Sequence, residues 1–325
     1  MAGGDPRQRV ALIVTVLDEA GTVDGLLESM GQQTRAPDEV VIVDGGSTDG
    51  TWEMLQTWTT RLPLRCLRAP GASIAEGRNL AVETATGDLI AVTDAGVRLE
   101  PDWLEQLLSE LTEDVDVVGG FFRADPLTTF ERAMGATVLP ARQDIDGASF
   151  LPSSRSVLFR RSAWAAVGGY PAWLDYCEDL VFDLDLKRAG QRFAFAPRAV
   201  AWFRPRGSFA AFFRQYYRYA RGDGKAGLFF DRHVIRYATY AVALGLLRRR
   251  GWGPLFLLPG IAAYTRRPYA RLWPQLAELS PMEAACALGL VPVIRAVGDI
   301  AKMLGYPVGV LWRWRRAQRA WTSRS

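Results

Sequence analysis

The pattern of apolar and polar positions in the front part of the chain switches repeatedly between two periods. Short apolar runs such as Val10–Val16 are continuous, whereas Val23, Leu26 and Met30 recur at the spacing of one helix face. Alternation of these two kinds predicts an α/β sheet with helices on both faces. The other predicted strands are 40–43, 89–93, 115–122, 157–159 and 192–195, and the other predicted helices are 51–60, 74–84, 101–111 and 178–188.

The C-terminal part of the chain carries further apolar runs, at 237–247, 254–264, 284–294 and 303–312. Each run has about ten residues, which is short of the ~20 that a simple membrane-spanning helix needs. The arginines at 248–250 separate the first two runs, as in a hairpin whose turn meets water or lipid phosphates. Arg295, Asp299 and Lys302 are spaced four and three apart, so they are expected to form one polar stripe on an otherwise apolar helix.

Charge divides the chain into two regions. Residues 1–225 carry 24 Lys and Arg against 31 Asp and Glu, whereas residues 226–325 carry 15 against 4. The acidic front argues against nucleic acid as a partner. The basic region mixes tryptophan with arginine at 311–316, which favours attachment to a membrane lipid surface. We therefore expect domains at 1–225 and 226–325 and a location on the cytoplasmic face of the cell membrane, the alternative being a soluble helical subdomain with an exposed basic tail.

Cysteine and histidine are too sparse for several kinds of chemistry. The cysteines are Cys66, Cys177 and Cys286, with no CxxC pair, which argues against a disulfide framework and against a cysteine zinc site. The one histidine, His233, excludes a multi-histidine metal site and is expected to be structural. Acid–base chemistry in this chain is therefore expected to fall to carboxylates.

Polar residues follow three of the predicted strands. Residues 15–19 follow the first strand, Asp44 follows the second, and Asp94 follows the strand at 89–93. Ligands of parallel α/β sheets bind just beyond the carboxyl ends of the strands, where these groups converge. Such carboxylates suit a ribose, a base edge or a hard cation. The alternative is that Asp44 and Asp94 only cap helices or shape turns.

Six short segments resemble, in consistent order, the motifs of the family 2 glycosyltransferases, which have the GT-A fold. The most specific is the Asp-rich turn Val-Asp-Gly-Gly-Ser-Thr-Asp-Gly-Thr at 43–51. The resemblance covers about residues 8–225. The other segments are the first motif at 13–20, the Ala-Arg-Asn-like segment at 74–79, the approach to the DxD motif at 86–94, the Glu-Asp motif at 177–179 and the QxxRW-like segment at 214–219.

The resemblance implies a GT-A fold, with a Rossmann-like mixed sheet, and a nucleotide-sugar donor. It implies that Asp94 touches the ribose and a divalent cation, Mg²⁺ or Mn²⁺, on the diphosphate. It also implies that Asp179 is the base that deprotonates a hydroxyl acceptor, a glycan or lipid-linked saccharide in cell-envelope or exopolysaccharide assembly. Its nucleoside residues are Thr15, Leu17, Glu19 and Asp44 with Arg78 nearby, and its diphosphate and acceptor residues are Glu178, Gln215, Arg218 and Tyr219.

The chemistry of inverting glycosyl transfer agrees with these roles. It needs one base behind the anomeric carbon, and arginine or a metal to neutralise the leaving diphosphate. The DxD motif departs from the family because it reads Asp94-Ala95-Gly96, which lacks the second carboxylate. A non-catalytic nucleotide-sugar-binding or scaffold protein is therefore the alternative function. Intact Asp179 and Arg218 favour the enzyme, because a pure binder needs no base.

Three other polar or aromatic features have plainer interpretations. Asp183 and Asp185 are expected to form an exposed, solvated helix face. The tyrosines at 216, 217 and 219 are expected to pack rather than to bind sugar. Arg155, in a polar loop before a strand, is equally consistent with a diphosphate contact and with a solvated position.

Overall fold

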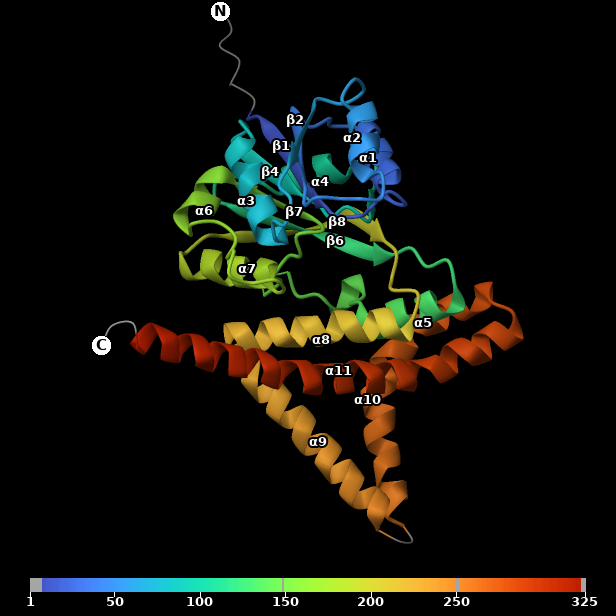
Figure 1. Ribbon diagram of the computed structural model, residues 1–325. Helices are drawn as coiled ribbons and strands as arrows, with labels where there is room; N and C mark the ends of the chain where they lie inside the picture. Colours follow the sequence, from blue (N-terminus) through green and yellow to red (C-terminus); the bar gives the residue numbers. More distant parts are fainter. Residues whose placement is uncertain (1–7, 148, 250–251, 323–325) are drawn as a thin grey trace, which may run out of the picture. The chain divides into compact units, whose positions relative to one another are not determined.

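The computed structural model describes residues 8–147, 149–249 and 252–322, with side chains as far as residue 316. The chain divides into two compact units (Figure 1). The first comprises Met1–Arg123 and Arg142–Phe203, and the second comprises Ala124–Ala141 and Arg204–Ser325. The second unit is therefore larger than the region 226–325 that composition predicts.

The first unit is built on one sheet in the order β3-β2-β1-β4-β7-β6-β8-β5. The parallel half contains β1 (Val10–Val16), β2 (Glu39–Asp44), β3 (Leu64–Arg68) and β4 (Leu89–Val92). The direction then changes, because β7 (Val157–Arg160) pairs antiparallel with β4. The remaining strands are β5 (Val97–Leu99), β6 (Val117–Ala124) and β8 (Phe193–Phe203).

Helices cover both faces of this sheet, as the sequence predicts. Along β1, Leu12 and Val14 belong to one buried cluster, and Ala11 and Ile13 belong to another on the opposite face. This burial on both sides explains why the central strand is a continuous apolar run. Helices α1 (Val23–Gly31), α2 (Thr51–Trp58) and α4 (Trp103–Ser109) contribute to the first cluster, and α3 (Ile74–Thr84), α6 (Arg161–Ala166) and α7 (Glu178–Arg188) to the second.

The second unit is helical over its described residues. Its main helices are α5 (Thr129–Val138), α8 (Phe209–Ala226), α9 (Phe230–Arg248), α10 (Leu257–Leu272) and α11 (Pro281–Thr322). Short 3₁₀ turns at Gly253–Phe256 and Trp273–Glu278 flank α10, and a third, Arg142–Asp144, belongs to the first unit. The expected hairpin is α9 and α10, which leave α11 and converge toward their connection (Figure 1).

Close packing against α11 explains why α8 joins the C-terminal helices. A Cβ atom on Gly224 would collide with the backbone oxygen of Tyr306, and one on Gly309 would collide with that of Arg221. Glycine at these positions lets the two helix backbones approach closely. This packing depends on residue size rather than on charge, so the charge boundary at 225 does not reveal it.

The two last apolar runs belong to one helix, which corrects the expectation of separate short segments. Helix α11 has 42 residues and continues through Pro292 and Pro307. The polar residues between the runs interrupt only one of its faces, so they do not end it. Of the described helices, Pro281–Arg316 alone is long and apolar enough to cross a membrane, by length and composition.

Candidate active site

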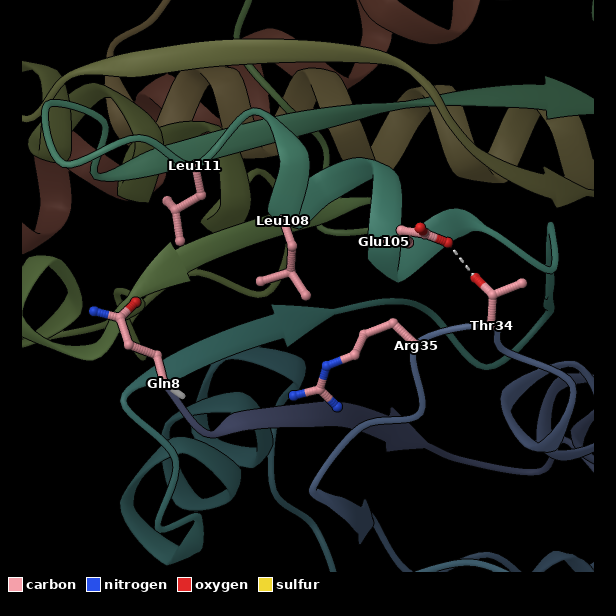
Figure 2. Close-up of a pocket in the computed structure, with 6 residues that line it drawn as sticks. All are labelled: Gln8, Thr34, Arg35, Glu105, Leu108 and Leu111. Atoms are coloured by element: carbon pink, nitrogen blue, oxygen red, sulfur yellow. Dashed lines mark hydrogen bonds between the residues drawn. The ribbon is translucent and has the colours of Figure 1, made fainter. Parts of the chain in front are cut away.

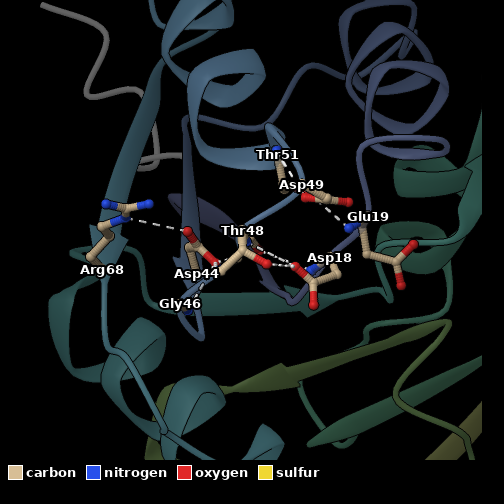
Figure 3. Close-up of polar contacts among 9 residues, drawn as sticks. Asp18, Glu19, Asp44, Gly46, Thr48, Asp49, Thr51 and Arg68 are labelled. Carbon is tan, nitrogen blue, oxygen red and sulfur yellow. Dashed lines mark hydrogen bonds and ion pairs between the residues drawn. The ribbon is translucent and has the colours of Figure 1, made fainter.

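The Asp-rich turn after β2 is held by Asp44, whose side chain is fully buried (Figure 3). Asp44 Oδ1 accepts hydrogen bonds from the backbone N–H groups of Gly46 at 3.1 Å and Ser47 at 2.8 Å. Gly46 has a φ of 103°, a left-handed conformation that favours glycine. Asp44 Oδ2 makes no hydrogen bond and lies 3.6 Å from Arg68 Nε. Asp44 therefore shapes the turn, which agrees with the alternative that it has a structural role. Its contact with a nucleoside stays a prediction.

The segment after β1 is tied to the same turn. Asp18, in a left-handed conformation with φ 53°, accepts at Oδ1 from the backbone N–H of Thr48 at 2.9 Å. The N–H of Glu19 donates to Thr51 Oγ1 at 2.8 Å (Figure 3). The Glu19 carboxylate accepts from Thr22, and Leu17 is 56% exposed. The two loops thus form one polar edge beyond β1 and β2. Sequence reasoning did not single out Asp18, although it stands in the first motif.

Helix α3 approaches β1 closely and so brings Arg78 to the strand ends. A Cβ on Gly77 would lie 2.8 Å from Thr15 Cγ2, so only glycine permits this approach. The helix starts at a capping box in which Ser73 and Glu76 bond each other's backbone N–H groups. Thr15 is half-buried on β1. Thr15 and Arg78 therefore belong to the same end of the sheet.

Arg78 is the centre of a buried ion-pair network. Its side chain is 4% exposed, and it donates to Glu178 Oε1 at 2.7 Å and to Asp94 Oδ1 at 2.9 Å. Its guanidinium lies over the Tyr170 ring at 5.3 Å, and its Nε has no hydrogen-bond partner. Burial opposes the charge of Arg78, but the carboxylates of Glu178 and Asp94 outweigh that effect and raise its pKa. Burial raises the pKa of Glu178, against the effect of Arg78.

Asp94 faces a second arginine. Arg155 Nε lies 3.4 Å from Asp94 Oδ2, and Thr93 Oγ1 donates to the backbone oxygen of Arg155 at 2.8 Å. The Asp94 side chain is 33% exposed. Arg155 therefore belongs to the site rather than to a solvated loop, and it supplies a positive charge beside the partly accessible Asp94 carboxylate.

The start of α7 carries the predicted catalytic carboxylate. Cys177 precedes the helix in a left-handed conformation with φ 65°, and Glu178 and Asp179 lie in the first turn. Glu178 is buried on Arg78, whereas Asp179 is half-buried and accepts at Oδ1 from the backbone N–H of Leu180 at 2.8 Å. Glu178 and Asp179 thus differ in surroundings, and Asp179 retains the more accessible carboxylate.

One expectation on α7 is wrong. Asp183 is not on an exposed face: its side chain is 4% exposed, and its Oδ2 has no hydrogen-bond partner. Burial raises the pKa of Asp183 well above its ordinary value, and the charge of Asp179 adds to the rise. Asp185, by contrast, forms a surface ion pair with Arg188 at 2.8 Å. The sequence of one helix does not show which of its faces is covered by other segments of the chain. It therefore predicts the same exposure for Asp183 and Asp185.

The QxxRW-like segment lies on α8 in the second unit. Gln215 Nε2 donates to the Tyr219 hydroxyl at 2.9 Å, and the Tyr216 ring packs against Phe212 at 4.5 Å. The packing interpretation of these tyrosines therefore holds for Tyr216. The placement of Gln215, Arg218 and Tyr219 beside the diphosphate and acceptor stays a prediction.

The side chains at Asp94 do not fit a divalent cation. Both Asp94 oxygens face guanidinium groups, of Arg78 and Arg155, and Gly96 stands where the family motif has its second carboxylate. Hard cations bind to several oxygen ligands. Within residues 8–147, 149–249 and 252–322 no group of three or more His, Cys, Asp or Glu side chains has metal-site geometry.

A hollow of about 480 Å³ lies at the other end of the sheet (Figure 2). Gln8 there precedes β1, and Thr34 and Arg35 precede β2, so the hollow is at the amino ends of these strands. None of the predicted site residues lines it. Its lining residues are Gln8, Thr34, Arg35, Glu105, Leu108 and Leu111.

Comparison with family models decides what kind of protein carries this site. A model described as glycosyl transferase family 2 matches residues 11–164, and one described as glycosyl transferase family group 2 matches residues 89–296. The second match covers more than half of the chain. The chain is a family 2 glycosyltransferase. It is therefore an enzyme that transfers a sugar from a nucleotide-sugar donor, and the alternative of a non-catalytic binding or scaffold protein is not supported.

Curated relatives agree with the family assignment. The chain is 29% identical over 257 residues to the succinoglycan biosynthesis protein ExoA of Rhizobium meliloti (strain 1021), a match that covers 73% of this chain and 77% of ExoA. It is 26% identical over 247 residues to the glycosyltransferase AglE of Haloferax volcanii, which covers 73% of this chain and 80% of AglE.

Solved structures show the fold. The mannosyltransferase PcManGT from Pyrobaculum calidifontis, in complex with GDP-Man and Mn²⁺, superposes with a TM-score of 0.59 at 21% identity, over 94% of this chain and 88% of PcManGT. S. aureus TarS 1-349 in complex with UDP-GlcNAc gives a TM-score of 0.51 at 16% identity, over 92% and 90% of the two chains. The predicted GT-A fold is confirmed.

Proposed function

We propose that this family 2 glycosyltransferase transfers its sugar with inversion to a hydroxyl of a glycan or lipid-linked saccharide in cell-envelope or exopolysaccharide assembly. The observation that carries the proposal is the network of Arg78, Asp94 and Glu178, which lies one residue from the Asp179 carboxylate. The similarity to ExoA, a succinoglycan biosynthesis protein, supports the class of acceptor.

The donor nucleoside binds along the polar edge beyond β1 and β2. Leu17 is exposed there and offers an apolar surface, and Glu19 and Asp44 offer carboxylates to the base or ribose. Asp44 Oδ2 lacks a hydrogen bond and is covered by Arg68, whose side chain is 46% exposed. Displacement of Arg68 by the nucleoside frees this oxygen to accept a hydrogen bond from the ligand.

The leaving diphosphate is neutralised by arginine. Arg155 is the group for this role, because it is half-buried and its Nε lies 3.4 Å from Oδ2 of the partly exposed Asp94 carboxylate. Arg78 is committed to two carboxylates and instead fixes Asp94 and Glu178 in place. Fixed positive charge beside a leaving group that gains negative charge lowers the barrier.

Asp179 takes the proton from the acceptor hydroxyl. Asp179 lies in the first turn of α7, at the positive end of the helix dipole. Asp179 Oδ1 is held by the Leu180 N–H, so Oδ2 is left to face the acceptor. The neighbouring Glu178 is less suited, because Arg78 occupies its carboxylate.

The expected dependence on Mg²⁺ or Mn²⁺ has support from PcManGT, whose structure contains Mn²⁺. In this chain Asp94 is the one carboxylate of the motif, and both of its oxygens are engaged by arginine. Arginine is therefore the group that neutralises the diphosphate in this proposal, and a comparison of turnover in EDTA and in Mn²⁺ tests whether an ion is needed as well.

The enzyme works on the cytoplasmic face of the cell membrane, attached through its C-terminal helices. The long apolar helix α11 and the basic charge of the region 226–325 support this attachment. The full-length protein is expected to sediment with membranes.

A donor screen tests the proposed function. Purified full-length protein is incubated with UDP-, GDP-, dTDP- and CMP-sugars, and thermal shift and slow donor hydrolysis are recorded. One class of nucleotide sugar is expected to stabilise the protein and to be hydrolysed, and hydrolysis is expected to fall in the Asp179→Asn variant. Binding without hydrolysis or transfer to any acceptor would support the scaffold alternative.

A further inference from the structure

A polar cluster lies inside the helical unit and contains none of the residues proposed for the sugar transfer. Asp299 on α11 is 5% exposed, and its Oδ1 accepts from Arg236 Nε on α9 at 2.8 Å. Its Oδ2 accepts from the hydroxyl of Tyr240 on α9 at 3.2 Å and from that of Tyr264 on α10. We call Arg236, Asp299, Arg295 and Lys302 the Asp299 cluster. It lies where α9, α10 and α11 meet.

Positive charge exceeds negative charge in the Asp299 cluster. Asp299 pairs with Arg236, but Arg295 and Lys302 form no ion pair with any described carboxylate. Arg295 lies over the Tyr264 ring at 4.5 Å and its Nε is buried without a hydrogen-bond partner, and Lys302 lies over the Tyr216 ring at 4.8 Å. The other nearby carboxylate, Asp223, faces His233 at 3.4 Å. Among the described residues, Arg295 and Lys302 therefore have no direct ion-pair partner, and Asp299 and Asp223 act on Lys302 only from a longer distance.

The helices that hold the cluster carry exposed apolar side chains on their outer faces. On α11 the exposed apolar residues recur at helical spacing, so they form one face that differs from the face of the cluster. The α9–α10 hairpin is also apolar outside. The exposed apolar residues are Val293, Ile300, Leu304, Val308 and Leu311 on α11, Ile235, Val242 and Leu247 on α9, and Trp252, Phe256, Leu258 and Ile261 at and beyond the hairpin turn.

We propose that the Asp299 cluster binds the phosphate headgroup of an anionic lipid, a phosphate monoester or diphosphate whose chain lies along the exposed apolar faces of α9, α10 and α11. Arg295 and Lys302 supply positive charge and hydrogen-bond donors to the anionic headgroup, which the surrounding apolar side chains cannot provide. Arg236, oriented by Asp299, is the third donor. One binding site with a cationic centre and apolar flanks matches a lipid phosphate better than a soluble one.

Lipid binding in the helical unit does not depend on Asp179, so its failure and the failure of the transfer mechanism are separate results. Full-length protein is mixed with vesicles of phosphatidylcholine that contain either phosphatidic acid, a phosphate monoester, or phosphatidylglycerol, a phosphodiester. The measured quantity is the ratio of the two partition coefficients. We expect the wild-type protein to prefer phosphatidic acid. Lys302→Gln and Arg295→Gln should each reduce this ratio about tenfold, because charge-assisted hydrogen bonds are roughly twice as strong as neutral ones.

Two further variants separate a binding site from general attraction and from misfolding. Arg266→Gln removes the same charge from an exposed position on α10, and it should leave the ratio unchanged. Lys302→Arg keeps the charge and should retain most of the preference. An equal loss in Arg266→Gln, or no preference in the wild type, overturns the proposal. Inorganic phosphate is titrated in parallel, and binding of it without any preference for phosphatidic acid vesicles shows that the ligand is soluble phosphate and also overturns the proposal.

Discussion

Arg78 Nη1 donates to Glu178 Oε1 at 2.7 Å, although the two residues are 100 positions apart in the chain. The bond joins helix α3 to the first turn of α7, the turn that carries Asp179. Arg78 also holds Asp94, so one guanidinium fixes the carboxylate after β4 and the helix start that presents the proposed base. In the proposed mechanism the donor side and the acceptor side of the reaction therefore share Arg78 as one buried anchor.

Removal of this anchor should destabilise the first unit. We expect Arg78→Met to lower the free energy of unfolding by about 3–5 kcal/mol, because it leaves the buried Glu178 carboxylate without its partner. Arg188→Met is the matched control, since Arg188 pairs with Asp185 at the surface and should cost less than about 1 kcal/mol. Urea denaturation of the two variants measures the difference. Equal losses would contradict the central role of Arg78.

Asp183 should make stability depend on pH. Burial raises its pKa well above the ordinary value in the folded protein. A carboxyl with a raised pKa stabilises the folded protein most at pH values below its unfolded pKa of about 3.9. This stabilisation is lost as the pH rises through the pKa of the folded protein. We therefore expect Asp183→Asn to flatten the fall in unfolding free energy between about pH 4 and neutral pH. Urea midpoints across that range measure it, and the exposed Asp185→Asn variant should keep the wild-type slope.

Asp44 is expected to contribute to nucleotide affinity as well as to its turn. Asp44→Asn keeps an oxygen that accepts from the N–H groups of Gly46 and Ser47, but it removes the charge at the unbonded position. We expect nucleotide affinity to fall by about 1.5–3 kcal/mol, the contribution of a hydrogen bond to a charged group. Ser47→Ala, which removes the bond to Asp44 and the bond from the Asp18 N–H but no charge, is the control. Calorimetric affinities that are unchanged in Asp44→Asn would limit Asp44 to a structural role.

Arg155 should affect the departure of the diphosphate more than the fold. Arg155→Gln leaves Asp94 paired with Arg78 but removes the accessible positive charge. We expect turnover to fall about 10²-fold, in the range that follows loss of charge stabilisation in the transition state, with a smaller change in donor affinity.

Turnover of the wild type should change less than about tenfold on replacement of Mn²⁺ by EDTA, because Asp94 offers no free oxygen to an ion. Complete loss of turnover in EDTA would show that a cation neutralises the diphosphate.

Much of the sheet unit was predictable from the sequence because its local signals agree. Helix α3 has the predicted bounds since Ser73 and Glu76 form a capping box, and α7 also has its predicted bounds. The central strands are buried on both faces and so are continuous apolar runs. Strand β3 was missed because its residues are only partly buried, and β5 because it has three residues.

Only the site residues that lie in recognisable motifs could be predicted from the sequence. The resemblance supplied Arg78, Asp94, Glu178 and Asp179, and the structure brings them together. Spacing alone does not reveal the bond between Arg78 and Glu178, because it depends on how α3 and α7 pack on the sheet. The burial of Asp183 and the pairing of Arg155 with Asp94 were missed for the same reason.

In the proposed mechanism the chemical step depends on Asp179. Asp179→Asn keeps an oxygen that accepts from the Leu180 N–H, so the helix start and the donor site are retained while the base is removed.

The most direct test is the turnover number of Asp179→Asn, measured beside its donor affinity with the preferred nucleotide sugar and acceptor. We expect unchanged donor affinity and a fall in turnover of at least about 10²-fold, the lower end for loss of a general base. Near-normal turnover in this variant would contradict the assignment of Asp179 as the base, and Glu178 would then be the first carboxylate to test in that role.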